Sequence, residues 1–241
     1  MFVVNLEFHN IVAKTLHDTK MARPDTCTAI VFLKTRVRAT NYDDLAKLVH
    51  MLQYLRGTSK LSLTLSANGS GILKWLLNAS FSFHPNMRGH SGGGLSLGRV
   101  LPIFSSTKQN INTKSSMETE IMVVDNFMPA IWWTGYFIAL QGYNVSYNSL
   151  QQDNKSSIIL GDNGKSSSRK ITKHINIRYF FITDRVNNGE VKVFRFPTGD
   201  MIGDYITKPL QGAYVQEFQR PNHGSDSGWR PRSSKGQGRT A

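Results

Sequence analysis

The chain has 241 residues, of which 39% are hydrophobic and 19% are charged, a balance that predicts a globular core and excludes a wholly disordered protein. Lysine and arginine outnumber aspartate and glutamate by 29 to 16, and the resulting net charge of +13 favours a polyanionic partner over an acidic small molecule, with a solvated lysine-rich surface as the alternative. Cys27 is the only cysteine, which excludes an internal disulfide and a cysteine-based zinc site, and its apolar neighbours at 28–32 predict a buried thiol.

The sequence also carries signals about the compartment. Residues 1–9 lack the basic region and the long apolar stretch of a secretory signal. The most apolar later window, 127–140, is too short to span a bilayer. We therefore expect an intracellular protein, in the cytoplasm or the nucleus, with no membrane partner.

Segment 1–70 is predicted to be a small helical unit. Asp25 precedes the apolar positions of residues 27–33 and is expected to cap a helix there. Asn41 is expected to cap the next helix, in which leucines recur at helical spacing until Gly57 ends it.

From about residue 71 the apolar pattern changes from helical to alternating. Residues 72–83 carry apolar side chains at one parity, which predicts a strand, and the alternations that follow predict a hairpin joined at Gly98. Further elements are predicted in the order helix, strand, helix, strand and short helix, at 119–140, 143–153, 173–186, 192–196 and 201–207. This order predicts an α/β fold in which helices pack on a mixed sheet.

Two more features complete the pattern. Trp132 and Trp133 lie in the middle of a predicted helix and are expected in the core. Residues 213–241 are rich in Gly, Ser and Arg, a composition that predicts a basic disordered tail.

Three acids stand in or beside predicted elements: Glu120 in a helix, Asp153 at the end of a strand and Asp204 in the last helix. Acids distant in the chain can converge on one sheet and bind divalent metal ions between them. Two such ions, one on each side of the scissile bond, can catalyse the hydrolysis of a phosphodiester. On type and position alone, such acids are more often surface residues or helix caps than metal ligands.

Four segments in order resemble the ribonuclease H domain of copia-type retrotransposon polyproteins. Residues 115–120, SSMETE, resemble Ser-Ser-Thr-Glu-Ala-Glu of that family, and residues 152–158, QDNKSSI, resemble Asp-Asn-Gln-Ser-Ala-Ile. Residues 172–179, TKHINIRY, resemble Thr-Lys-His-Ile-Asp/Asn-Ile-Arg-Tyr, and residues 203–210, GDYITKPL, resemble Ala-Asp-x-x-Thr-Lys-Pro-Leu.

The upstream part resembles the end of the reverse transcriptase of the same family. This likeness is carried by ARPD at 22–25 and YLRGT at 54–58. The adjacent acids Asp43 and Asp44 fall in the first turn of a predicted helix, which is not the strand context of a polymerase site, so we expect no polymerase activity.

The resemblance implies a ribonuclease H-like mixed five-stranded sheet flanked by helices over 71–212, preceded by the helical segment 1–70 and followed by the tail 213–241. It also implies a two-magnesium site with Glu120, Asp153 and Asp204 as ligands. The fourth ligand position departs from the family, which has Val-Asp-Ala-Ser-Phe where this chain has LNASF at 77–81. Because Asn78 lacks the charge of the aspartate, the second ion is expected to bind poorly and hydrolysis to be impaired or lost. Neither Glu118 nor Asp125 is expected to replace the missing ligand.

Nucleic-acid binding rests on other residues than cleavage. Basic side chains in and around the third motif are expected to contact the phosphates of an RNA–DNA hybrid: Lys165, Arg169, Lys170, Lys173 and Arg178. A further partner is the rest of a Pol polyprotein, if the chain is part of a complete element. Two alternatives stay open, an active magnesium-dependent ribonuclease H and a non-catalytic basic binding module.

Overall fold

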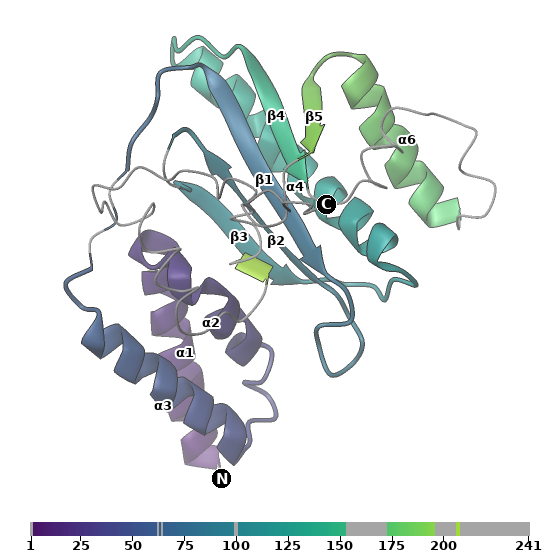
Figure 1. The fold of residues 1–241 in the computed structure, drawn as a ribbon. Helices are drawn as coiled ribbons and strands as arrows, with labels where there is room; N and C mark the ends of the chain where they lie inside the picture. The colour runs from purple at the N-terminus through teal and green to yellow at the C-terminus, as the bar shows by residue number, and fades with distance from the viewer. Residues whose placement is uncertain are drawn as a thin grey trace, which may run out of the picture.

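The computed structural model describes residues 2–61, 63, 65–98, 101–152, 173–195 and 206–207. Its first part is helical, as predicted, with α1 at Phe2–Ala22, a short 3-10 helix η1 at Pro24–Thr26, α2 at Cys27–Lys34 and α3 at Tyr42–Gly57. Figure 1 shows these helices gathered together beside the sheet. The predicted cap of α3 is confirmed, because Asn41 Oδ1 accepts the backbone N–H of Asp44 at 2.8 Å while the Asp44 carboxylate accepts that of Asn41 at 3.2 Å.

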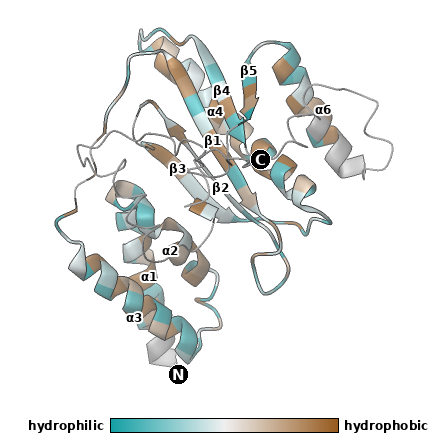
Figure 2. Cartoon of the chain, viewed as in Figure 1, coloured by the Kyte–Doolittle hydropathy of each residue, from teal (hydrophilic) through white to brown (hydrophobic). Residues whose placement is uncertain are grey.

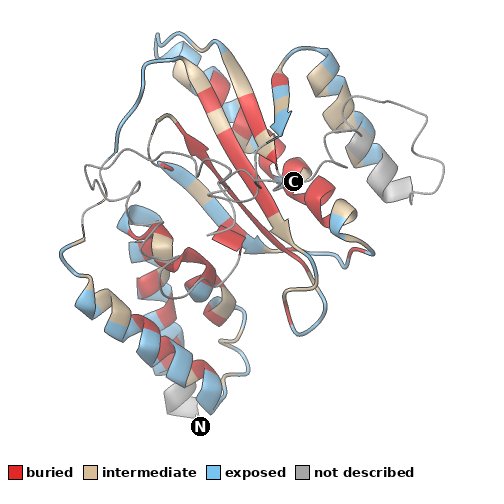
Figure 3. Ribbon diagram, viewed as in Figure 1, coloured by how far each residue is buried: buried red, intermediate tan, exposed pale blue. Residues whose placement is uncertain are grey.

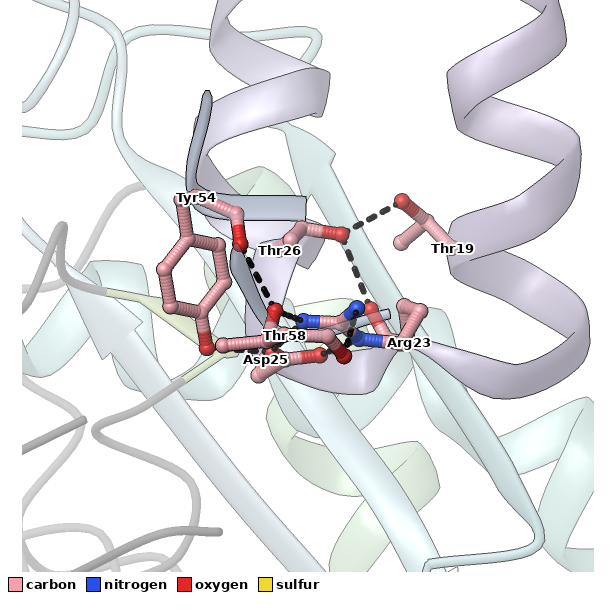
Figure 4. Close-up of polar contacts among 6 residues, drawn as sticks. All are labelled: Thr19, Arg23, Asp25, Thr26, Tyr54 and Thr58. Atoms are coloured by element: carbon pink, nitrogen blue, oxygen red, sulfur yellow. Dashed lines mark hydrogen bonds and ion pairs between the residues drawn. The ribbon is translucent and has the colours of Figure 1, made fainter. Parts of the chain in front are cut away.

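The predicted cap at Asp25 is wrong. The residue before α2 is Thr26, which makes no side-chain capping bond. Asp25 instead accepts two bonds from Arg23, at 3.0 and 2.7 Å, and one from the Tyr54 hydroxyl at 2.5 Å (Figure 4). Arg23 also donates to Thr58 Oγ1 at 2.7 Å, so the two family-like segments ARPD and YLRGT bind each other and fasten η1 to α3.

The second part is a five-stranded mixed sheet in the order β3-β2-β1-β4-β5. Its strands are β1 at Ile72–Ser80, β2 at His90–Ser96, β3 at Ile103–Lys108, β4 at Tyr147–Gln152 and β5 at Val191–Arg195. The first three strands form an antiparallel meander, whereas β4 is parallel to β1 and β5 is parallel to β4. Parallel neighbours require crossovers, which here contain α4 at Ser116–Leu140 and α6 at Lys173–Asn187. The predicted fold class, an α/β fold with a mixed five-stranded sheet flanked by helices, is therefore confirmed.

The two faces of β1 pack against different layers. Leu73, Trp75 and Leu77 face α4, where their cluster includes Val123 and Phe127. Leu76 belongs to a second cluster, which contains residues of α1, α2 and α3 together with Leu101 and Ile206. The strand is thus buried on both faces along most of its length, as its colour in Figure 3 shows. Figure 2 shows hydrophobic residues along the same strand. The predicted strand was too long at its end, because β1 stops at Ser80 and Phe81 is 45% exposed.

Strand β2 contains three consecutive glycines, Gly92, Gly93 and Gly94, and it is buried along its whole length. A Cβ atom at Gly93 would collide with the Leu77 side chain of β1. A Cβ atom at Gly92 would lie 2.5 Å from Thr207 Cγ2 and 2.9 Å from the Ile206 carbonyl. The missing side chains therefore let residues 206–207 lie directly against the sheet.

Helix α4 continues through Pro129 and carries the two tryptophans. Trp132 packs against Phe181 of α6, with ring centroids 5.4 Å apart, so its predicted place in the core is confirmed. For Trp133 the prediction was wrong, since its side chain is 61% exposed and stacks on Phe137 at the surface. Within the ranges that the structure describes, we find no helix with both the length and the apolar content needed to cross a membrane.

Candidate functional site

Asn78 lies near the end of the central strand β1, where its side chain is only 3% exposed. Its amide nitrogen Nδ2 donates to Thr207 Oγ1 at 3.0 Å, and its Oδ1 accepts the backbone N–H of Ala79 at 2.9 Å. An aspartate here would have no N–H to donate, so the bond to Thr207 in its present direction depends on the amide.

Glu120 reaches the same place from α4. Ser115 begins this helix by accepting the backbone N–H of Glu118 at 3.2 Å, which sets Glu120 in the second turn. Glu120 is 5% exposed, and its Oε1 accepts the backbone N–H of Ala79 at 3.2 Å. The predicted pair Asn78 and Glu120 is therefore brought together at one backbone amide.

Gln152 joins them from the end of β4. Because β4 is parallel to β1, with Gln151 paired to Leu76, the ends of the two strands lie at the same edge of the sheet. Gln152 is 1% exposed, and its Nε2 donates to Glu120 Oε2 at 3.3 Å. Four segments distant in the sequence thus meet in one buried polar cluster, Asn78–Glu120–Gln152–Thr207, which we call the sheet-end cluster.

The remaining predicted ligands, Asp153 and Asp204, lie outside the described residues. In the sequence, Asp153 follows Gln152 directly, and Asp204 precedes Thr207 by three positions. Of the predicted nucleic-acid-binding residues, three also lie outside the described residues, as does the side chain of a fourth: Lys165, Arg169, Lys170 and Lys173.

Arg178 is the predicted phosphate contact that the structure does describe. Its Nε donates to Asp125 Oδ2 at 2.7 Å, in a pair whose side chains are 29% and 26% exposed. This bond joins α6 to α4, and the contact of Arg178 with a phosphate stays a prediction. Asp125, which the sequence analysis did not place at any contact, thus joins α4 to α6.

The described residues supply one of the three carboxylates of the predicted two-magnesium site. Magnesium in such centres is held by carboxylate oxygens and water, and the sheet-end cluster offers one carboxylate beside two side-chain amides. Among the residues that the structure describes, no group of three His, Cys, Asp or Glu side chains is placed to hold a metal ion.

A second chain of buried polar side chains, His84–His90–Ser106, ends at the backbone carbonyl of Ile206. His84 Nε2 lies 3.0 Å from His90 Nδ1, and His90 Nε2 lies 2.6 Å from Ser106 Oγ, which donates to the Ile206 carbonyl at 2.8 Å. Burial lowers the pKa of His84 to about 4 and that of His90 to about 3, so both imidazoles are neutral at pH 7.

The comparison with family models gave no match. Among curated proteins, the chain is 28% identical over 216 residues to the retrovirus-related Pol polyprotein from transposon RE2 of Arabidopsis thaliana, an alignment that covers 89% of this chain and 15% of the relative. It is also 28% identical, over 88% of its length, to the corresponding protein from transposon RE1, and 24% identical, over 86%, to that from transposon TNT 1-94 of Nicotiana tabacum.

In sequence, the chain is similar to retrotransposon Pol polyproteins. It spans about one seventh of the length of these curated Pol relatives, since the alignments cover 14% and 15% of them. The structure of the foamy viral protease-reverse transcriptase in complex with RNA/DNA hybrid is similar with a TM-score of 0.41 and 13% identity, over 72% of this chain and 21% of that one. The native prototype foamy virus protease-reverse transcriptase gives a TM-score of 0.34 and 9% identity, over 86% of this chain and 26% of that one.

Two members of the sheet-end cluster were not predicted from the sequence, Gln152 and Thr207. Thr207 stands in the fourth family-like segment, so its place in a motif was the signal available for it. Gln152 begins the second segment and ends a buried strand, but an amide at a strand end carries no chemical signal of its own. Its role depends on the side chain that it meets from α4.

Proposed function

We propose that this chain is a retrotransposon-derived ribonuclease H-like domain that binds RNA–DNA hybrid and whose two-metal phosphodiester hydrolysis is impaired by Asn78. The observation that carries the proposal is the place of Asn78. It lies on the central strand of the sheet. Its side chain and that of Glu120, the acid that the family resemblance assigns to the metals, both accept the backbone N–H of Ala79.

The physical reason for the impairment is charge. Two divalent ions close together need several carboxylates to offset their mutual repulsion, and Asn78 brings a neutral oxygen in place of a charged one. That oxygen already accepts the N–H of Ala79, and the other end of the amide donates to Thr207. If the family's metals bind here, Glu120, Asp153 and Asp204 would hold them, and the ions would supply an activated water and stabilise the leaving oxygen.

Binding of the hybrid should survive the loss of cleavage. The net charge of +13 favours contacts between basic side chains and phosphates, which need no metal ion. These contacts release counterions from the nucleic acid, so the affinity falls as the salt concentration rises. We expect the hybrid to bind with a steep dependence on salt concentration and with little dependence on its base sequence.

The deciding experiment compares the native chain with Asn78→Asp in a hybrid-cleavage assay with Mg²⁺ or Mn²⁺. We expect little or no cleavage by the native chain and a gain of about tenfold or more in the substituted one, because the loss of even an outer-shell partner of a metal ligand costs about tenfold. Asn126→Asp, an exposed position of α4, is the matched control and should leave the rate unchanged.

Other outcomes would select the alternatives. Robust cleavage by the native chain would mean an active ribonuclease H and would overturn the proposed impairment. Binding that shows no salt dependence would overturn the nucleic-acid partner and favour a module that binds protein.

A further inference from the structure

Both oxygens of the Glu120 carboxylate accept N–H donors from the chain itself. Oε1 accepts from the Ala79 backbone at 3.2 Å, and Oε2 accepts from Gln152 Nε2 at 3.3 Å. The donors come from β1 and β4, the two strands whose ends form this edge of the sheet. The arrangement is therefore part of the fold and not a chance contact of a surface side chain.

Burial makes these donors energetically important. Glu120 is 5% exposed and Gln152 is 1% exposed, so neither has more than marginal access to bulk water. A buried carboxylate needs partners that favour its charge, which a metal ion or N–H groups can supply. In the sheet-end cluster, amide N–H groups of the chain donate to both oxygens of Glu120.

We propose that Gln152 is a second determinant of the impaired metal site, because its side-chain amide occupies the position on Glu120 Oε2 that a metal ion would need. The inference rests on the proposed function and adds to it a residue that the family resemblance did not assign. Each carboxylate oxygen has two lone pairs, and Gln152 Nε2 donates to one of those on Oε2, so a cation that approaches Oε2 from the side of β4 competes with this donor.

One consequence is that restoring the aspartate at position 78 repairs the site only in part. A metal ion that approaches Glu120 must still displace the amide of Gln152 and break a buried hydrogen bond to a charged group. The loss of such a bond corresponds to about a tenfold change in an equilibrium constant.

The test is a titration of the full chain with Mn²⁺ alone at pH 8, with bound and free ions counted by electron paramagnetic resonance. Three proteins are compared: Asn78→Asp, Asn78→Asp with Gln152→Met, and Asn78→Asp with Gln109→Met. Methionine keeps the length of glutamine and removes its N–H donors. Gln109 is the matched control because it is also 1% exposed and donates to the Thr119 carbonyl at 3.0 Å, beside Glu120 but not to it.

We expect Gln152→Met to tighten Mn²⁺ binding about tenfold relative to Asn78→Asp alone, and Gln109→Met to leave it unchanged. Equal or weaker binding after Gln152→Met would overturn the inference. A thermal melt of each protein with and without Mn²⁺ gives the second readout, in which Gln152→Met should lower the melting temperature without the ion and enlarge the rise that the ion causes. Gln152→Ala repeats the comparison if the methionine variant does not fold.

The inference and the proposed function fail in different ways. Hybrid cleavage by the native chain would overturn the impairment, whatever the Mn²⁺ titrations give. A gain of cleavage from Asn78→Asp with no effect of Gln152→Met on Mn²⁺ affinity would leave the role of Asn78 standing and overturn that of Gln152.

Discussion

At the scale of single residues, His84 and His90 have the most strongly shifted pKa values of the histidines that the structure describes. The pKa of His84 is lowered from 6.5 to about 4, first by burial and then by the charge of Lys108, and the pKa of His90 is lowered to about 3 by burial and by His84. Both rings lie in a tight aromatic group with Phe83, whose centroid is 5.0 Å from that of His84. The neutral forms are favoured because no carboxylate that the structure describes pairs with either ring.

These shifts predict a loss of stability in mild acid. The folded-state pKa values are below the unfolded value, so between pH 6.5 and about 4 the unfolded chain binds protons that the folded chain does not, and stability falls as the pH falls. From pH 6.5 to 5 the loss amounts to about 1.6 kcal/mol for each of the two histidines. Urea unfolding at a series of pH values measures this slope. His84→Gln should remove the His84 share, and a slope unchanged by that substitution would contradict the assignment.

At the scale of elements, a buried ion pair between Arg23 and Asp25 holds the side chains through which η1 contacts α3. The Asp25 side chain is fully buried, that of Arg23 is 11% exposed, and Tyr54 adds a hydroxyl donor from α3. Burial and the neighbouring Asp25 raise the pKa of Tyr54, so the hydroxyl keeps its proton across the physiological range.

Asp25→Ala should destabilise the helical unit by about 3 to 5 kcal/mol, because it leaves the Arg23 charge buried without its carboxylate. Thermal or urea unfolding of the full chain measures the change. The control is Asp43→Ala, which removes the exposed pair of Asp43 with Lys47 and should cost less than about 1 kcal/mol. Equal changes in the free energy of unfolding for the two substitutions would show that the buried ion pair stabilises the chain no more than the exposed one.

The contact between β1 and β2 depends on a close backbone approach at Gly93. Gly93→Ala should destabilise the chain by about 1 to 3 kcal/mol, since the new methyl group would meet the side chain of Leu77 and the carbonyl of Leu76. Gly57→Ala is the matched control, because nothing lies within 4 Å of its added Cβ, and it should be neutral or slightly stabilising. A neutral Gly93→Ala, measured by the same unfolding assay, would mean that the sheet can open at this point.

The sequence predicted these elements well where one local signal dominates. Asn41 and Asp44 form the expected capping box, and the alternation of residues 72–80 gives a strand with Leu73, Trp75 and Leu77 on one face. The prediction was wrong where the place of a side chain depends on residues distant in the sequence. Asp25 was predicted to cap a helix, but in the fold it binds Arg23 and Tyr54. Trp133 was predicted in the core, but α6 packs on Trp132 and leaves Trp133 exposed.

At the scale of the whole molecule, the same limit applies to the candidate site. Family-like segments identified Asn78 and Glu120, and the fold brings both to the Ala79 amide. The contacts of Gln152 and Thr207 could not be predicted, because they depend on the parallel register of β4 with β1 and on the glycines of β2, which let residues 206–207 lie against the sheet. The motif around Thr207 marked the residue, but it did not indicate that Asn78 is its partner.

The helical unit and the sheet share one apolar core. Phe8 and Ile30 of the helices, which are at most 1% exposed, pack in the same cluster as Leu76, Leu101 and Ile206. This cluster covers the face of β1 that α4 does not reach, so each part supplies the apolar surface that the other buries. The predicted boundary near residue 70 thus separates two kinds of secondary structure that are joined by a continuous core.

Removal of residues 1–70 should therefore expose that face of the sheet and destabilise what remains. Several large side chains would lose their cover, and each that becomes exposed costs about 1.5 to 3 kcal/mol, enough together to consume the stability of a typical domain. We expect the truncated chain to bind a hydrophobic dye and to lose a cooperative urea transition. Removal of 213–241, the predicted basic tail, is the control and should leave the transition unchanged. A truncated chain that unfolds cooperatively, without binding the dye, would show that the sheet and its own helices fold independently of the N-terminal unit.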